Sequence, residues 1–311
     1  NLKTNRLPKK INKKIILLFG PTASGKSKIA EDIAKIYNAE IINADSMQIY
    51  KEIKILNTRP DKNLTKKVKH HLYGFVSVKK KFSVGKWIIL ANKLIKQIIN
   101  KKKVPIIVGG TGLYFKSLTD GLVKIPNIPI SFRKKIIDYQ KKVGQKKFYK
   151  QLIKIDPKSK SKINPKDVQR SIRAFEVKKL SKISLFDWFD KTKSSFKKDQ
   201  FQKIYLDFPR DILLKRIEKR CIKIVNTASI KEVARFKKMK VRNELSSNKI
   251  IGINEINNYL QKNYNLDQTR EKILIKTRQY AKRQATWARG HMSDWKRLTP
   301  NEIKNYIKNF K

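Results

Sequence analysis

Short runs rich in apolar residues alternate with amphipathic stretches in the first third of the chain. Residues 15–19, 39–43 and 104–108 form such runs, which are typical of strands buried on both faces of a sheet. Apolar residues recur at helical spacing in the segment that ends near Tyr37 and again over residues 84–100. This alternation predicts an α/β fold with a parallel sheet flanked by helices.

The middle of the chain has a different character. Pro126 and Pro129 mark the start of a Lys-rich segment with a helical pattern, so we expect an inserted helical subdomain over residues 127–200. Strand character returns at residues 203–208, and Pro209 opens a further predicted helix. We therefore expect residues 1–126 to form the first part of the core, and residues 201–311 to return to it and end in basic helices.

The charge of the chain is strongly one-sided. It has 76 Lys and Arg against 24 Asp and Glu, a formal charge of +52 over 311 residues. Such a charge argues against most ordinary metabolic enzymes and indicates a polyanionic partner. Lys, Ile and Asn are abundant while Arg is scarce, a bias that an AT-rich genome produces by codon usage alone. The Arg residues are therefore better pointers to function than the Lys residues.

Cysteine content and hydropathy bear on the compartment. Cys221 is the only cysteine, which excludes a disulfide framework and a zinc ribbon. The basic start at residues 1–10 precedes only a short apolar run, and no stretch approaches the ~18 apolar residues of a membrane span. We expect a cytoplasmic protein with no membrane contact.

A glycine-rich loop follows the first predicted strand. Gly20, Gly25, Lys26 and Ser27 fit the pattern GxxxxGKS, and the loop lies between a predicted strand and a predicted helix, as this P-loop motif requires. The backbone amides of such a loop face a phosphate, the Lys adds a charge, and the Ser hydroxyl binds Mg²⁺. The motif therefore predicts binding of ATP or of another phosphate ester.

Two further loops are expected at the same edge of the sheet. Gly109, Gly110, Thr111 and Gly112 follow the third strand, and this turn either approaches a ligand or serves packing alone. The strand end lacks the Mg²⁺-binding Asp of an ordinary P-loop kinase. Asp45 follows the second strand, where a carboxylate can bind Mg²⁺, accept a proton or cap a helix.

Seven sequence blocks follow one another at residues 20–27, 45–50, 70–72, 108–118, 168–174, 206–217 and 280–290. They are GPTASGKS, DSMQIY, HHL, VGGTGLYFKSL, VQRSIRA, LDFPRDILLKRI and YAKRQATWARG. In these blocks the chain resembles the tRNA dimethylallyltransferases, the bacterial type of tRNA isopentenyltransferase. The resemblance extends from about Ile15 to Arg289.

The resemblance implies transfer of a dimethylallyl group from dimethylallyl diphosphate to the exocyclic amine of the adenosine at position 37 of tRNA. It implies that Asp45 takes a proton from this amine and that Thr111 lies at the reaction centre. Mg²⁺ and the loop amides would stabilise the departing diphosphate. The implied diphosphate-binding residues are Gly20, Thr22, Ala23, Ser24, Gly25, Lys26 and Ser27, of which Ser27 binds Mg²⁺.

The resemblance also implies contacts with the tRNA anticodon stem-loop, from which the adenosine must be unstacked. Gln48 has an amide that can contact an adenine edge. Lys282 and Arg283 suit RNA or the diphosphate, unless they belong to a solvated basic face. The implied tRNA-binding residues are Asp45, Ser46, Met47, Gln48, Arg133, Gln169, Arg170, Ser171, Ile172, Arg173, Lys282, Arg283 and Gln284.

Some details of this interpretation stay open. Arg210, Arg216 and Arg220 lie along one predicted helix, and their spacing does not show which of them reaches the diphosphate. The family usually has a Gly-Tyr pair where this chain has Gly252 and Ile253, and residues 221–233 also depart from its pattern. These departures concern fine tRNA contacts and local stability rather than the reaction.

Two other functions remain compatible with a P-loop and a basic chain. A nucleoside or small-molecule kinase would need ATP, and a non-catalytic RNA-binding protein would need a P-loop that has lapsed. The complete P-loop and Asp45 argue against a lapse, and the glycine turn after the third strand argues against a kinase. We expect a monomer whose partners are tRNA and dimethylallyl diphosphate.

Overall fold

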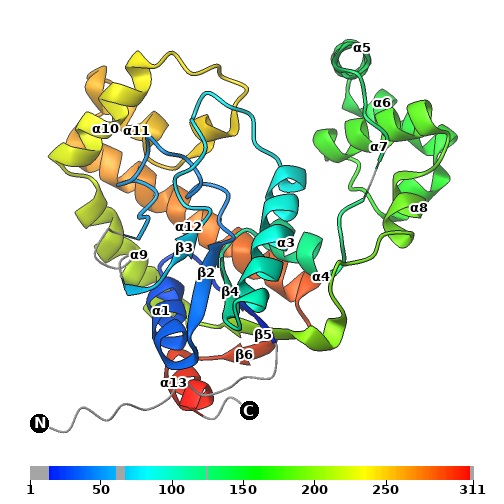
Figure 1. The fold of residues 1–311 in the computed structure, drawn as a ribbon. Helices are drawn as coiled ribbons and strands as arrows, with labels where there is room; N and C mark the ends of the chain where they lie inside the picture. Colours follow the sequence, from blue (N-terminus) through cyan, green and yellow to red (C-terminus); the bar gives the residue numbers. More distant parts are fainter. Residues whose placement is uncertain (1–13, 61–66, 124, 309–311) are drawn as a thin grey trace, which may run out of the picture. The chain divides into compact units, whose positions relative to one another are not determined.

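The computed structural model describes residues 14–60, 67–123 and 125–308 (Figure 1). The chain forms two compact units. An α/β unit comprises the residues up to Thr119 and those from Phe196 onward, and a helical unit comprises residues 120–195. The basic start of the chain, residues 1–10, lies outside the described residues.

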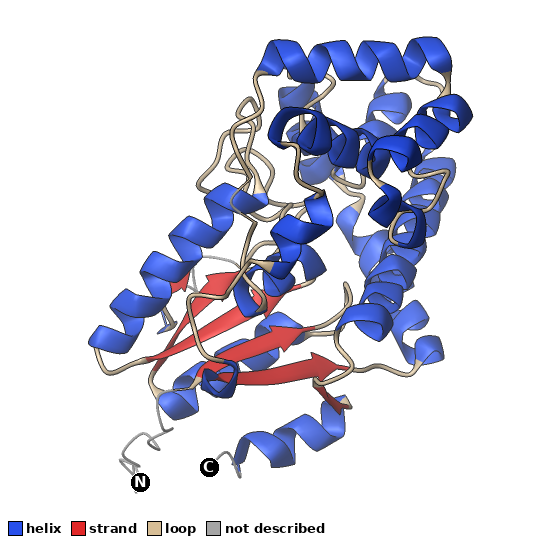
Figure 2. Ribbon diagram, turned by 90° about the vertical axis from the view of Figure 1, so that its right-hand side faces the viewer, coloured by secondary structure: helices blue, strands red, loops and turns tan. Residues whose placement is uncertain are grey.

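Six strands of the described residues form one parallel sheet in the α/β unit (Figure 2). They are β1 (Ile15–Phe19), β2 (Ala39–Asn43), β3 (His70–His71), β4 (Val104–Gly109), β5 (Phe201–Leu206) and β6 (Lys296–Leu298). Their order across the sheet is β3-β2-β4-β1-β5-β6, so β1 lies between β4 and β5. All five residues of β1 are buried, as its apolar run predicts. The predicted parallel α/β fold is confirmed.

Helices cover both faces of the sheet. Side chains alternate along each strand, so the buried strands present apolar side chains to helices on both faces. These helices are α1 (Lys26–Tyr37), α3 (Val84–Asn100), α4 (Gly112–Thr119) and α13 (Pro300–Lys308). On one face Leu18 of β1 belongs to an apolar cluster with Ile33 of α1 and Ile303 of α13. On the other face the ring of Phe19 lies 5.6 Å from the ring of Phe115 in α4, and α3 packs beside α4.

The last part of the α/β unit adds helices with an apolar core of their own. They are α9 (Arg210–Ile224), α10 (Thr227–Lys238), the 3₁₀ helix η3 (Ser246–Lys249), α11 (Ile253–Leu260) and α12 (Leu266–His291). One buried residue from each α-helix, Ile217, Phe236, Ile256 and Ile273, joins this cluster. Ile53, in the loop that follows β2, belongs to the same cluster, so these helices are fixed to the end of the sheet where the P-loop lies.

The helical unit packs around Phe148, Leu152 and Phe175. Its helices are α5 (Ile130–Val143), α6 (Gln145–Ile155), α7 (Val168–Ser181) and α8 (Leu185–Asp190), with a 3₁₀ helix η1 (Pro157–Ser161). A Cβ on Gly121 would lie 2.4 Å from the carbonyl oxygen of Lys193, so the two ends of the unit run close together. The unit therefore begins and ends a few residues before the limits of the predicted range 127–200.

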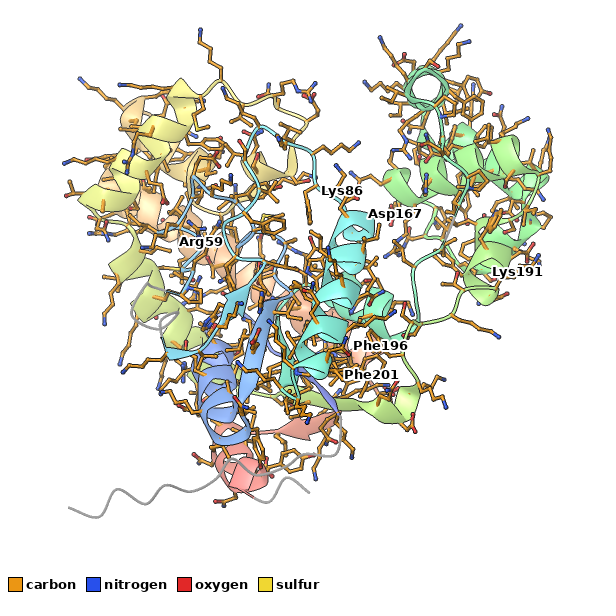
Figure 3. All side chains as sticks on the ribbon, in the orientation of Figure 1. Arg59, Lys86, Asp167, Lys191, Phe196 and Phe201 are labelled. Carbon is orange, nitrogen blue, oxygen red and sulfur yellow. The ribbon has the colours of Figure 1, made fainter. Side chains whose placement is uncertain are left out.

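Nitrogen-tipped side chains project from the surfaces of both units (Figure 3). The rings of Phe196 and Phe201, labelled there, pack edge to face with centroids 6.1 Å apart. They flank the 3₁₀ helix η2 (Lys198–Gln200) and hold the chain where it enters β5. Within the described ranges, no helix is both long and apolar enough to cross a membrane.

Candidate functional site

The P-loop joins β1 to α1 in a tight turn. Ala23 and Gly25 have positive φ angles of 63° and 81°, and the amide of Ser24 donates to the carbonyl oxygen of Pro21 over 3.2 Å. Gly25 adopts the left-handed conformation without strain because it has no Cβ. Helix α1 begins at Lys26, so its unpaired N-terminal amides and the positive end of its dipole lie beside the loop.

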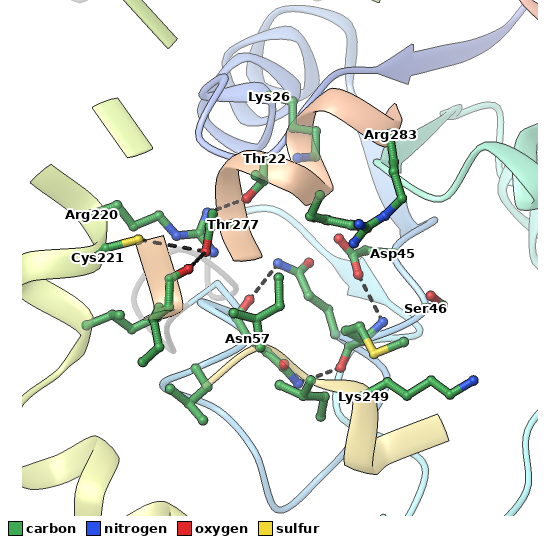
Figure 4. A pocket seen from close by; sticks show the side chains of 18 residues that line it. Thr22, Lys26, Asp45, Ser46, Asn57, Arg220, Cys221, Lys249, Thr277 and Arg283 are labelled. Atoms are coloured by element: carbon green, nitrogen blue, oxygen red, sulfur yellow. Dashed lines mark hydrogen bonds between the residues drawn. The ribbon is translucent and has the colours of Figure 1, made fainter. Parts of the chain in front are cut away.

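A cavity of about 290 Å³ lies against the P-loop, the loop after β2 and helices α9 and α12 (Figure 4). Its lining includes four cationic side chains, Lys26, Arg220, Lys249 and Arg283, and one carboxylate, Asp45. The excess of positive charge favours an anionic ligand. The site residues Thr22, Ser46, Met47 and Gln48 also line this cavity.

Lys26 is the cation of the P-loop. Its Nζ donates to the carbonyl oxygen of Pro21 over 3.2 Å. Burial lowers the pKa of Lys26 to about 8, the charge of Asp45 opposes this shift, and Arg220 adds to it. A bound anion would favour the charged ammonium and restore a higher pKa.

The structure distinguishes the three Arg residues that the sequence left equivalent. Arg220 Nη1 donates to Thr22 Oγ1 over 3.0 Å. Arg216 Nε donates to the carbonyl oxygen of Ala23 over 2.8 Å. Arg210, at the first position of the same helix, is exposed and lines neither cavity beside the P-loop. Arg216 and Arg220 therefore contact the P-loop, whereas Arg210 does not line either cavity beside it.

Asp45 and Thr111 follow the adjacent strands β2 and β4, and hydrogen bonds connect their loops. Asp45 Oδ1 accepts from the amide of Met47 over 2.9 Å, so Asp45 caps a turn rather than a helix. Thr111 Oγ1 accepts from the amide of Ser46 over 2.9 Å and lies 3.2 Å from Ser46 Oγ. The two candidate catalytic residues are thus held at neighbouring positions.

The glycines after β4 permit close packing. A Cβ on Gly109 would lie 2.1 Å from the carbonyl oxygen of Ala44, and a Cβ on Gly110 would lie 2.0 Å from Gln284 Nε2. The first distance leaves no room for a side chain beside the backbone, and the second would displace the amide of Gln284. Both glycines therefore permit close packing, and Thr111, which follows them, hydrogen-bonds Ser46.

A loop that the sequence analysis did not single out supports Gln48. Gln48 Nε2 donates to the carbonyl oxygen of Asn57 over 2.9 Å. Glu232 of α10, which is 4% exposed, accepts from the amides of Lys54, Ile55 and Leu56 over 2.6, 2.9 and 3.1 Å. The sequence offered one signal for this contact: Glu232 is one of only 24 acidic residues in a strongly basic chain.

Part of the cavity lining is apolar. The apolar side chains include Leu56, Ile224, Ile250, Ile251 and Ile273. Among the described residues that line the cavity, Tyr280 is the one aromatic, and its hydroxyl lies near Thr111. Burial and the nearby charge of Asp45 raise the pKa of Tyr280, so its hydroxyl stays protonated. A ligand with an anionic head and a short hydrocarbon tail fits a cavity lined by both cationic and apolar side chains.

The three consecutive residues of α12 predicted to bind tRNA differ in exposure. Lys282 and Arg283 are exposed, and Arg283 also lines the cavity. Gln284 is 4% exposed, and its side chain hydrogen-bonds Thr22 and Gly110. The side-chain amide of Gln284 therefore contacts the P-loop and the turn after β4 within the protein.

The helical unit contains the remaining predicted tRNA-binding residues. Gln169 and Arg170 are exposed on α7, Ile172 is half-buried, and Ser171 is buried with its hydroxyl donating to the carbonyl oxygen of Asp167 over 2.7 Å.

Glu176 holds two Arg residues of the helical unit. This carboxylate, 1% exposed, accepts from Arg133 Nε over 2.9 Å and from Arg173 Nη1 over 2.7 Å. Both Arg side chains are more than a third exposed, so each fork is oriented by Glu176 while part of it faces solvent.

A second cavity of about 340 Å³ also borders the P-loop, and its lining includes Gly25, Lys26 and Ser27. The described residues contain no group of three His, Cys, Asp or Glu side chains that could hold a metal ion. A metal at Ser27 would therefore complete its coordination shell with water and with oxygens of a bound phosphate compound. This is the usual situation for Mg²⁺ bound with phosphates.

The fold and the loop at residues 20–27 define the class: a P-loop α/β protein with a small anion site and an attached apolar cavity. A family model described as IPP transferase matches residues 48–291. A tRNA dimethylallyltransferase of Pelagibacter ubique is 54% identical over 298 residues, covering 96% of this chain and 95% of that protein. The chain belongs to the IPP transferase family and is therefore an enzyme. The family predicted from the seven blocks is confirmed.

Further relatives agree with this family. A tRNA dimethylallyltransferase of Rickettsia canadensis is 42% identical, covering 91% of this chain and 87% of that protein. The structure of a tRNA isopentenylpyrophosphate transferase from Bacillus halodurans matches with a TM-score of 0.69 and 28% identity, covering 96% of this chain and 95% of that one. A eukaryotic dimethylallyltransferase acting on tRNA matches with a TM-score of 0.81 and 25% identity, covering 96% and 76%.

Proposed function

We propose that this enzyme transfers a dimethylallyl group from dimethylallyl diphosphate to the exocyclic amine of adenosine 37 in the anticodon loop of tRNA, acting as a monomer. The single observation that carries the proposal is the cavity that Lys26, Asp45 and a set of apolar side chains line together. A prenyl diphosphate combines an anionic diphosphate, which suits the cationic side chains, with a hydrocarbon chain, which suits the apolar ones. The names of the relatives, which are tRNA dimethylallyltransferases, support the same reaction.

In this proposal the diphosphate binds at the P-loop. The amides of residues 25–27, the ammonium of Lys26 and the guanidinium of Arg220 face its oxygens. They stabilise the negative charge that grows on the diphosphate as its bond to the allylic carbon breaks. The hydroxyl of Ser27 would hold Mg²⁺ together with diphosphate oxygens, and the metal would supply additional stabilisation of the leaving group. Strand β4 ends in Val108 and Gly109 instead of the acidic residue that a kinase uses for its metal.

Asp45 is proposed to take the proton from the adenosine amine. Its Oδ1 is held by the Met47 amide, which orients the carboxylate in the cavity lining. The amine is a weak nucleophile, so proton removal as the new carbon–nitrogen bond forms lowers the barrier. The hydroxyl of Thr111 is hydrogen-bonded to Ser46, the residue that follows Asp45.

We propose that tRNA is bound by the loop at residues 45–48, by Lys282 and Arg283, and by the helical unit. Arg133 and Arg173 carry exposed guanidinium edges that suit phosphate oxygens and unstacked bases. The adenosine leaves the anticodon stack to reach the cavity, because a base inside the stack cannot present its amine.

A labelling experiment tests the reaction. The purified protein is incubated with Mg²⁺, unmodified tRNA and either labelled dimethylallyl diphosphate or labelled ATP. We expect label from the prenyl donor to enter tRNA at adenosine 37 without ATP, and the Lys26→Met variant to abolish incorporation. Transfer of phosphate from ATP, with no prenyl label in tRNA, would establish the kinase alternative instead.

A further inference from the structure

One face of α12 contacts the glycine turn after β4. Tyr280, Gln284 and Trp287 lie at positions i, i+4 and i+7 of this helix, which places them along one stripe. Tyr280 lies near Thr111, Gln284 donates to the carbonyl oxygen of Gly110, and a Cβ on Gly112 would lie 2.0 Å from Trp287 Nε1. Three successive residues of the turn therefore each meet one residue of the stripe.

Gln284, at the centre of the stripe, joins this turn to the P-loop. Its Oε1 accepts from the backbone amide of Thr22 over 2.8 Å, and its Nε2 donates to the carbonyl oxygen of Gly110 over 3.0 Å. A primary amide is suited to this bridge because one end accepts and the other donates. The side chain is 4% exposed, so either bond, once lost, would leave a buried polar group without a partner.

The surrounding sequence fits the bridge. A Cβ at position 110 would lie 2.0 Å from Gln284 Nε2 and 3.3 Å from the carbonyl oxygen of Gly20. The absence of a side chain on Gly110 therefore lets both the Gln284 amide and the P-loop lie close to this turn. The amide of Thr22 is bonded to Gln284 and that of Ser24 to Pro21, so the amides at the start of α1 and the side chains of Lys26 and Arg220 remain for the anion.

We propose that Gln284 is a positioning residue, which holds the P-loop and the turn carrying Thr111 at a fixed separation so that a bound diphosphate and the Asp45–Thr111 pair face one another. This inference rests on the proposed function. It differs from the tRNA contact that the family resemblance implies for Gln284, because the amide is buried and occupied on both ends within the protein.

The Gln284→Met variant tests this role. Met has a similar length and volume but forms neither hydrogen bond. Gln279, an exposed glutamine on the same helix, provides the matched control Gln279→Met. We expect Gln284→Met to weaken binding of inorganic diphosphate and to raise KM for dimethylallyl diphosphate about tenfold or more, with KM for tRNA changed less than about twofold. The control should match the wild type.

The Gln284→Glu variant adds a readout that a purely structural role would not produce. A protonated carboxyl group can accept from Thr22 and donate to Gly110, whereas a carboxylate can only accept. Diphosphate affinity, expressed relative to the wild type at each pH, should therefore recover as the pH falls. Hydrogen exchange should also show faster exchange of the Thr22 amide in Gln284→Met than in Gln279→Met.

The outcomes separate the inference from the proposed function. A rise in KM for tRNA alone, or unchanged diphosphate binding in Gln284→Met, would overturn the positioning role. A Gln284→Glu variant whose relative affinity is the same at every pH would also overturn it. If the wild type binds diphosphate but transfers no prenyl group to tRNA, the proposed function fails, while the effect of Gln284→Met on diphosphate binding still tests the bridge.

Discussion

The guanidinium of Arg220 donates a hydrogen bond over 3.0 Å to the side-chain oxygen of Thr22, although the two residues are 198 positions apart in the chain. Its other terminal nitrogen donates to Thr58 Oγ1 over 2.7 Å. One side chain of α9 thereby connects the P-loop to the loop that supports Gln48. Burial lowers the pKa of Arg220, yet a guanidinium remains charged at any physiological pH.

We expect Arg220→Gln to weaken diphosphate binding about 10- to 100-fold, because a charge-assisted hydrogen bond contributes about 1.5–3 kcal/mol. Arg210→Gln is the matched control, since Arg210 is exposed on the same helix. Titration calorimetry with inorganic diphosphate measures both. Equal effects of the two substitutions would show that net charge, rather than the Thr22 contact, decides affinity.

Asp45→Asn should lower kcat for prenyl transfer by about 10²-fold or more, the usual scale for loss of a general base. The Asn side chain keeps an oxygen for the Met47 amide, so binding of tRNA and of the donor should change little. Single-turnover transfer and filter binding measure the two quantities, with Asp32→Asn on the exposed side of α1 as the control. A near-normal kcat would remove Asp45 from the chemistry.

Diphosphate affinity should fall as the pH rises through about 8, the pKa to which burial lowers Lys26. Below this pH the ammonium is already charged; above it, binding must also take up a proton, so affinity falls by up to about tenfold per pH unit. Lys26→Arg stays charged and should show no such fall. Calorimetry from about pH 7 to pH 9.5 tests this, and a flat wild-type profile would contradict it.

Two glycine substitutions should have opposite effects on stability. A Cβ on Gly109 would meet backbone atoms of Ala44 at 2.1 and 2.2 Å, so Gly109→Ala should lower the free energy of unfolding by about 1–3 kcal/mol or more. A Cβ on Gly290, near the end of α12, would have open space around it, so Gly290→Ala should be neutral or stabilise by up to about 1 kcal/mol. Denaturant unfolding compares them, and a Gly109→Ala variant as stable as the wild type would refute this packing argument.

Local patterns in the sequence were sufficient for the main elements. The run at residues 15–19 and the glycine motif after it predict β1, the P-loop and α1, because strand, turn and helix each have a signal within a few residues. Strands β3 and β6 have only two and three residues, lie at the two edges of the sheet, and include charged or His residues. No alternation can be recognised over so short a length, so the sequence did not predict them.

Contacts between segments far apart in the chain could not be predicted from local sequence patterns. Glu232 and Gln284 each bind backbone groups more than 170 positions away, and nothing in their local sequence names those partners. The family resemblance assigned Gln284 to tRNA from its place in a block, whereas burial and hydrogen bonding are properties of the folded chain. The choice among Arg210, Arg216 and Arg220 likewise depended on how α9 meets the P-loop.

The position of β1 between β4 and β5 has a consequence for synthesis on the ribosome. β1 and β4 are available early, but β5 begins only at Phe201, after the whole helical unit has been translated. Until then one edge of an entirely apolar strand has no partner, and such an edge can pair with another chain. The nascent protein is therefore most prone to aggregation while residues 120–195 are being made, even though the described part of that segment contributes no strand to the sheet.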